Sequence, residues 1–423
     1  MSSVKMKPSR YQTIAQTIRD RILTGRYTPG EKIPSIRQLA DAFRCNKLTV
    51  HRAFEMLKQE GLIENRIGSG SFVRFPETLT APQGIFDFHT DYLDESLFPY
   101  GQIQRIFNGL FNAEKAHALA PTPPEGDADL IRVLSQFYHV PAQQMVIISG
   151  AQQGLDLVAK VFAADISESM LFEDPTYPGA ISLFKARHFV ALDGDGPDPN
   201  QLEDKVLHTP IRLFYTMPAV HNPTGRAYSR EKKTAIAEMA RRHGFFIVED
   251  NFLSELRPQA GPRFVDICPE QTIHIKSLSQ TTVSGIRLGF MVVPEKLFEK
   301  FLYAKFSSDI ASFGLMQRCM RAFIQQGLYQ KHLKKVTRIM NFRKHRLQAL
   351  IDRLDHLTVS PDQAGFSLWV RSDLPSSQSS VPWRRGEDFS FSPQARFYFR
   401  LSFMHMDDET FKNGIEYLAR LWR

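Results

Sequence analysis

The chain has 423 residues, 43% hydrophobic and 23% charged, which suits two or three globular domains with large cores. Three widely spaced cysteines, Cys45, Cys268 and Cys319, argue against a disulfide framework and show no metal-ligand spacing. No apolar run approaches the roughly 18 residues that span a membrane, and the N-terminus lacks the apolar core of a signal peptide. We therefore expect a cytoplasmic protein without a membrane partner or a bound metal.

Positive charge is concentrated at the N-terminus. Residues 1–75 hold 14 Lys and Arg against 6 Asp and Glu, whereas the remainder holds 39 of each sign. The whole formal excess of +8 therefore lies in the first sixth of the chain. A small basic domain indicates a polyanionic partner, although a solvated basic face would give the same count.

Three helices are predicted in this basic segment. Apolar residues four apart predict the first, over 11–24. The pattern Ser35-Ile-Arg-Gln38 is a capping box that opens a second helix through Phe43. The third has an apolar face with i, i+3, i+4, i+7 spacing: Val50, Ala53, Phe54 and Leu57. Its N-terminal end presents polar side chains suited to the major groove of DNA: Lys47, Thr49, His51 and Arg52.

Residues 62–66 and 71–74 predict a hairpin around Gly68-Ser69-Gly70. With the motifs Ile33-Pro-Ser-Ile-Arg37-Gln-Leu-Ala40 and Glu60-Gly-Leu-Ile63, the segment resembles a GntR-type winged helix-turn-helix. The resemblance implies contacts to double-stranded operator DNA from Arg37, Lys47, Thr49, His51 and Gly68, with Arg52 on the same helix. The family usually has an arginine at the position of Lys47. An arginine can donate two parallel hydrogen bonds to one base, whereas the lysine ammonium is a compact single charge.

Residues 76–84 hold two prolines without apolar periodicity and predict a linker between a domain over 1–75 and a body over 85–423. From about residue 145, short apolar runs alternate with helical patterns. This predicts an α/β fold with a mostly parallel sheet, whose ligands bind beyond the carboxyl ends of the strands. Late helices lead into a small C-terminal α+β subdomain, about 305–423.

Six motifs resemble those of fold-type I aminotransferases that depend on pyridoxal 5'-phosphate (PLP): Gly150-Ala151-Gln152, Pro175-Thr-Tyr177, Asn222-Pro-Thr-Gly225, Glu249-Asp250-Asn-Phe252, Ser277-Leu-Ser279-Gln280 with Arg287, and Phe399-Arg400-Leu-Ser-Phe403. Together with the N-terminal domain, they are similar to the MocR subfamily of bacterial regulators.

The resemblance assigns a role to each motif. Backbone N–H groups of Gly150, Ala151 and Gln152 would hold the phosphate, with Ser277, Ser279 and Arg287 completing the site. Tyr177 would stack on the pyridine ring, Asn222 would bond the phenolic oxygen, and Asp250 would pair with the pyridinium nitrogen. Arg400 would bind a substrate α-carboxylate. The family also implies a homodimer, and hence an operator with two half-sites.

Two positions depart from the family pattern. Gln280 stands where the family has the lysine that forms a Schiff base, and an amide is not a nucleophilic amine. Phe252 stands where the family has a tyrosine that reaches the cofactor. We therefore expect non-covalent PLP binding without catalysis. Lys276, four residues before Gln280, is the alternative amine.

The sequence thus favours a transcriptional regulator, either a repressor or an activator, whose effector is PLP, another B6 vitamer or an amino acid. Control of vitamin B6 metabolism would suit a sensor that binds PLP without reacting. Two alternatives stay open at this point. One is an aminotransferase with an appended DNA-binding domain, and the other is a repressor with a vestigial, empty pocket.

Overall fold

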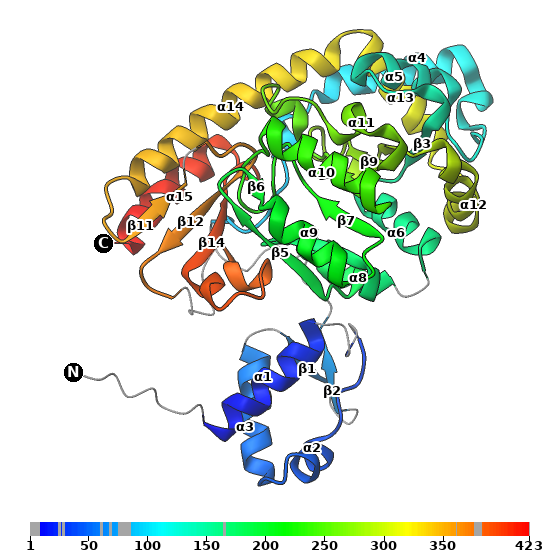
Figure 1. The fold of residues 1–423 in the computed structure, drawn as a ribbon. Helices are drawn as coiled ribbons and strands as arrows, with labels where there is room; N and C mark the ends of the chain where they lie inside the picture. Colours follow the sequence, from blue (N-terminus) through cyan, green and yellow to red (C-terminus); the bar gives the residue numbers. More distant parts are fainter. Residues whose placement is uncertain are drawn as a thin grey trace. The chain divides into compact units, whose positions relative to one another are not determined.

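The computed structural model describes residues 9–23, 27, 30–59, 62–66, 70–74, 86–163, 166–360, 362–375 and 383–422. These residues divide between two compact units, one holding the described residues up to 74 and the other those from 86 onward (Figure 1). The predicted linker, residues 76–84, lies outside the described residues. Each unit is considered by itself.

The described part of the N-terminal unit has three helices and a hairpin: α1 (Arg10–Leu23), α2 (Ile36–Ala42), α3 (Lys47–Gln59), β1 (Ile63–Arg66) and β2 (Gly70–Val73). The strands pair antiparallel, with Ile63 opposite Val73. The predicted capping box is present, since Gln38 N donates to Ser35 Oγ (3.3 Å) and Ser35 N donates to Gln38 Oε1 (2.8 Å). These reciprocal bonds fix the start of α2.

The predicted apolar faces of these helices meet in one core. Its buried members include Ile14, Ile18, Leu39, Val50, Ala53, Phe54, Leu57, Ile63 and Val73. Burial of each large aliphatic side chain contributes about 1.5–3 kcal/mol, which this small unit needs because its surface is large relative to its volume. The core leaves the polar side of α3 uncovered.

A mixed, mostly parallel sheet forms the centre of the second unit. Its eight strands, within the described residues, run in the order β3 (Met145–Ile148), β10 (Gly289–Val292), β9 (Thr272–Ser277), β8 (Phe246–Asp250), β7 (Leu213–Thr216), β4 (Met170–Asp174), β5 (His188–Asp193) and β6 (Gly196–Pro197). The strands from β9 to β5 are parallel. β10 runs antiparallel to both β3 and β9, and β6 runs antiparallel to β5. The predicted fold class is therefore confirmed.

Helices cover both faces of this sheet: α4 (Tyr100–Glu114), α5 (Ala128–Tyr138), α6 (Ala151–Val161), α7 (Ile166–Ser169), α8 (Pro178–Phe184), α9 (Pro199–His208), α10 (Arg230–His243), α11 (Phe264–Ile267), α12 (Phe298–Asp309) and α13 (Gly314–Gln325). Successive strand residues face opposite layers. Phe172 and Tyr215 pack in a cluster with residues of α6, α8 and α12, whereas Leu171 and Phe214 pack with residues of α9, α10 and α11. No described helix could cross a membrane.

A four-stranded antiparallel sheet forms the C-terminal subdomain, in the order β11 (Leu357–Val359), β12 (Ser367–Ser372), β14 (Tyr398–Ser402) and β13 (Arg384–Arg385), with helices α14 (Leu328–Ile351) and α15 (Asp408–Leu421). The segment around Phe88, at the start of the second unit, packs against this sheet. Phe88 pairs with Trp383 as an isolated bridge, and its carbonyl accepts from Ser402 N (2.8 Å). The start of the second body thus packs on its last strand, which local periodicity did not indicate.

Arg343 on α14 is fully buried and joins the helix to the segment after β14. It donates to the carbonyls of Phe403 (3.0 Å) and Met406 (2.7 Å) and pairs with the exposed Asp408 (2.7 Å).

Arg343→Met should lower the free energy of unfolding by about 2–5 kcal/mol, because two carbonyls lose their donor. Asp408→Asn, the matched control, should change it by less than about 1 kcal/mol. Urea unfolding measures both, and equal effects would contradict this account.

Candidate functional site

A backbone arrangement suited to an anion lies where β3 leads into α6. Gly150 caps the helix with φ 86° and without a side-chain cap, which leaves the first N–H groups available. Arg287 Nη2 donates to the Ser149 carbonyl (2.9 Å), so its guanidinium lies beside the helix start. A Cβ at residue 150 would lie 2.8 Å from that nitrogen. Free N–H groups, the helix dipole and a guanidinium together favour a phosphate.

The turn after β9 is fixed by its own backbone. Leu278 N donates to the Leu288 carbonyl (2.9 Å), and Leu288 N donates to Ser279 Oγ (3.1 Å). Ser277 and Ser279 are buried, and Gln280 is half-buried. Gln280 follows directly after these fixed residues, three positions beyond the end of β9.

Asp250 ends β8 as a buried carboxylate with one partner. Its Oδ2 accepts from Tyr215 (2.9 Å), whereas Oδ1 is buried without a hydrogen-bond partner. Burial raises the pKa of Asp250 to about 6. A cation placed at Oδ1 would satisfy the orphaned oxygen and stabilise the ionised form. Sequence patterns did not single out Tyr215; the only signal is a tyrosine within a buried strand.

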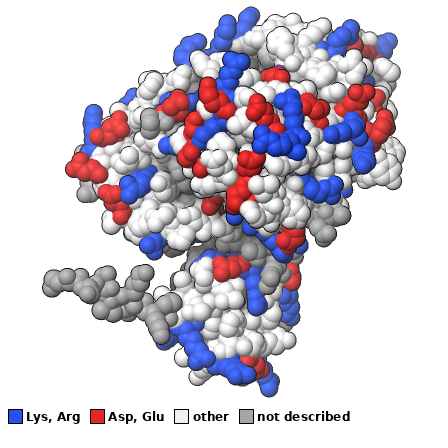
Figure 2. Space-filling model, in the orientation of Figure 1, with Lys and Arg blue, Asp and Glu red and all other residues white. Residues whose placement is uncertain are grey.

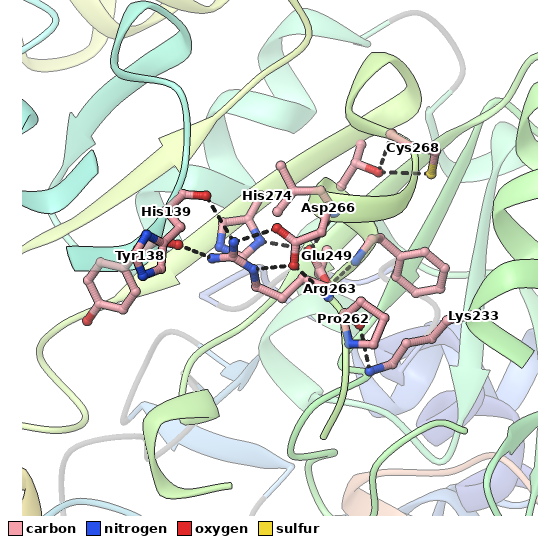
Figure 3. Close-up of polar contacts among 12 residues, drawn as sticks. Tyr138, His139, Lys233, Glu249, Pro262, Arg263, Asp266, Cys268 and His274 are labelled. Atoms are coloured by element: carbon pink, nitrogen blue, oxygen red, sulfur yellow. Dashed lines mark hydrogen bonds and ion pairs between the residues drawn. The ribbon is translucent and has the colours of Figure 1, made fainter. Parts of the chain in front are cut away.

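Glu249 anchors the other face of the same strand end (Figure 3). Its carboxylate lies 2.8 Å from His274 Nδ1 on β9 and accepts from Phe264 N (2.8 Å). Although burial opposes ionisation, the bond to His274 lowers the pKa of Glu249. Arg263, beside this pair, donates to the Tyr138 carbonyl (2.8 Å). The network fixes β8 to its neighbours and so orients Asp250.

Tyr177, Asn222 and Arg400 come together from distant parts of the chain. Asn222 Oδ1 accepts from Arg400 Nη1 (3.0 Å), and the Tyr177 hydroxyl lies 3.4 Å from Gln152 Oε1. Burial raises the pKa of Tyr177 to about 12, with Tyr92 and Asp250 acting in the same direction and Arg400 opposing it. These groups therefore lie within electrostatic reach of one another.

Lys276 does not lie free. It is fully buried, its Nζ donates to the Phe252 carbonyl (3.1 Å), and it pairs with Glu255. Glu255 also accepts from Tyr138 (2.5 Å) and Tyr329 (3.0 Å). Burial lowers the pKa of Lys276, opposed by the Glu255 charge. The amine is thus engaged in a closed network. The Phe252 side chain packs against the core.

The residues expected to contact DNA lie on the surface of the N-terminal unit. Arg37, Lys47, His51 and Arg52 are exposed and Thr49 is half-buried. Asn46 Oδ1 accepts from Leu48 N (3.0 Å), which fixes the start of α3. Figure 2 shows basic side chains on the face of this unit in view. Gly68 lies outside the described residues. No described cluster of His, Cys, Asp and Glu is placed to hold a metal ion.

The fold and the site define a winged-helix DNA-binding unit joined to an aminotransferase-like unit. The chain belongs to the aminotransferase class I and II family, whose model matches residues 102–418, and residues 10–73 match the bacterial regulatory proteins of the gntR family. This combination is that of the MocR-type transcriptional regulators.

The chain is similar both to transcriptional regulators and to aminotransferases. The uncharacterized HTH-type transcriptional regulator YcxD of Bacillus subtilis is 28% identical, over 87% of this chain and 88% of its own. The probable rhizopine catabolism regulatory protein MocR of Rhizobium meliloti is 24% identical, over 96% and 92%. Among solved structures, LysN of Thermus thermophilus, an α-aminoadipate aminotransferase complexed with N-(5'-phosphopyridoxyl)-L-leucine, matches with a TM-score of 0.73 and 25% identity, over 80% of this chain and 92% of its own.

Asp250 predicts an unusual dependence of stability on pH. Because its pKa is about 6 in the folded chain and about 3.9 when unfolded, the folded state binds more protons between these values. The free energy of unfolding should therefore fall as pH rises from about 4 to 6, by on the order of 3 kcal/mol. Ligand-free Asp250→Asn should lack this loss. Urea unfolding at several pH values measures it, and identical profiles for both proteins would count against a strained carboxylate.

Proposed function

We propose that this chain is a DNA-binding transcriptional regulator whose aminotransferase-like unit binds PLP non-covalently as its effector. The observation that carries the proposal is the buried Asp250 carboxylate, with its unpartnered Oδ1, in a site that has Gln280 at the turn after β9. The proposal assigns to this site the groups that would bind a cofactor, and Lys276, the described amine nearest to the turn in the sequence, is paired with Glu255.

The residues fit the chemical groups of PLP. The start of α6 with Arg287, Ser277 and Ser279 would hold the phosphate, and Asp250 Oδ1 would receive a protonated ring nitrogen. Asn222 and Tyr177 would contact the phenolic oxygen and the ring. When bound, PLP supplies an electrophilic carbonyl, and in this chain the residue opposite it is expected to be an amide.

The enzyme hypothesis needs a different amine. Its support is the likeness to transaminases, including the 2-aminoadipate transaminase of Thermus thermophilus, 27% identical over 81% of this chain and 91% of its own. Lys276 is the nearest candidate in the sequence, and its ion pair with buried Glu255 would have to break before it could act. Removing one partner of a buried pair costs about 3–5 kcal/mol, which opposes this route.

A homodimer is part of the proposal. Exposed apolar side chains gather at the end of α12 and just beyond it: Tyr303, Phe306, Ile310 and Phe313. Asp309, among them, accepts from Gln153 of α6 (2.7 Å), so this surface adjoins the phosphate cradle. An apolar patch of this kind marks an interface. Two copies would present two α3 helices to an operator with two half-sites.

Vitamin B6 metabolism is the proposed target of regulation, because a sensor that binds PLP without reacting reports the vitamer itself. The ligand can switch the protein only if it binds one of two states more tightly. A change from mostly one state to mostly the other requires roughly 5 kcal/mol of difference between the two affinities.

Gln280→Lys should convert a non-covalent PLP complex into a covalent one, because it supplies an amine at the turn. Borohydride reduction followed by mass spectrometry should give one cofactor-sized mass gain at residue 280 in the variant and none in the wild type. Gln280→Met, of similar length but without an amine, is the matched control and should behave as the wild type. A wild-type adduct on Lys276 would restore the enzyme hypothesis, and absence of PLP binding to all three proteins would indicate a vestigial pocket.

Lys47→Ala should weaken DNA binding at every sequence and lower the slope of log affinity against log salt by about 1, as expected for one lost phosphate contact. Lys412→Ala, an exposed lysine of the second unit, is the matched control and should leave both unchanged. Fluorescence anisotropy with duplexes selected by the full chain measures this.

PLP should shift the wild-type affinity for the selected duplex, and an unchanged affinity would contradict the effector role.

A further inference from the structure

Arg400 already has a carboxylate partner within its own chain. Its Nη1 donates to Asp91 Oδ2 and to Asn222 Oδ1, both at 3.0 Å, and its Nη2 donates to the His89 carbonyl (3.1 Å). The arginine is 6% exposed, and Phe389 lies under the guanidinium at 5.1 Å. The position at which a ligand carboxylate would bind is therefore occupied by Asp91.

The segment that carries Asp91 is attached to the same subdomain as Arg400. Phe88, before it, accepts from Ser402 N (2.8 Å), and Asp94, after it, donates to the Met404 carbonyl (2.7 Å). Ser402 lies two residues beyond Arg400 on β14. Because the backbone is held on both sides, Asp91 would move together with Arg400 whenever this subdomain moves. The ion pair itself is made within this subdomain, whereas the bond from Arg400 to Asn222 reaches the segment after β7 of the large sheet.

Carboxylates outnumber arginines around this pair. Arg384 lies opposite Arg400 in register on β13, and its Nε is 3.4 Å from Asp388 Oδ2. Asp87 Oδ1 also accepts from His89 N (2.8 Å), so three carboxylates lie around two arginines. Burial and the two arginines lower the pKa of His89 to about 4, so its imidazole is neutral at pH 7. An additional carboxylate would make this cluster still more negative and leave Asp91 without its cation.

We propose that Asp91 is an internal carboxylate that occupies Arg400, so that the effector pocket accepts PLP and carboxylate-free amines and rejects the α-carboxylate of amino acids. The inference rests on the proposed PLP site and names its ligand class. Asp91 is then a specificity-determining residue: it removes the attraction that Arg400 would offer an amino acid and adds repulsion against it.

Two reduced ligands that differ only in the carboxylate test this. N-(5'-phosphopyridoxyl)-L-leucine carries it, and N-(5'-phosphopyridoxyl)-3-methylbutylamine lacks it. Neither needs a reacting lysine. Calorimetric titration of the full chain should show that the wild type binds the amine ligand at least about tenfold more tightly than the leucine ligand. A charge-assisted hydrogen bond is worth a factor of this order.

Asp91→Asn should reverse the preference, and Asp91→Asn/Arg400→Gln should abolish it. Asp373→Asn, at an exposed carboxylate of the same subdomain, is the matched control and should keep the wild-type preference. If a variant fails to fold, the ratio of the two ligand affinities of the wild type still tests the inference. Tighter binding of the leucine ligand by the wild type would overturn it. Equal binding of both ligands by a wild type that also binds PLP would overturn only the inference. Failure of PLP and both ligands to bind would overturn the proposed function as well.

Discussion

The aminotransferase-like unit contains a carboxylate that is buried and only half satisfied by hydrogen bonds. Asp250 has a single hydrogen-bond partner, Tyr215, and its second oxygen faces no donor. Such a group destabilises the ligand-free fold, because burial disfavours its charged form. The neighbouring Glu249, fixed by His274 and by the backbone of α11, holds the strand end that carries it. A cationic ring nitrogen would relieve the strain, so ligand binding and the stability of this unit are coupled.

Two further buried charges bear on the proposed non-covalent binding of PLP. Lys276 is held by Glu255 within a network of tyrosines, and Arg400 is held by Asp91. In an enzyme, Lys276 would serve as the reacting amine and Arg400 would bind the substrate carboxylate. Here each of these cations has a carboxylate partner from its own chain. This arrangement suits a sensor for the vitamer itself. It also explains in physical terms why a fold shared with transaminases need not accept their substrates.

Much of this architecture could be predicted from the sequence. Helical periodicity located α1 and α3, the pattern Ser35 to Gln38 located the start of α2, and apolar runs located the parallel strands. The motifs at strand ends located Gly150, Asp250 and Arg287 because such positions are set by local turns. What could not be predicted was the choice of partner for each buried charge. Asp91 and Arg400 are 309 positions apart, and no local pattern specifies that pairing.

A crystal structure of the full chain with PLP tests the central claim most directly. The account predicts the phosphate at the start of α6 beside Arg287, the ring nitrogen within about 3 Å of Asp250 Oδ1, and no covalent bond to any side chain. The pair between Asp91 and Arg400 should stay intact in that structure. Continuous density between the cofactor and Lys276, with the bond from Lys276 to Glu255 broken, would contradict the account and indicate an enzyme.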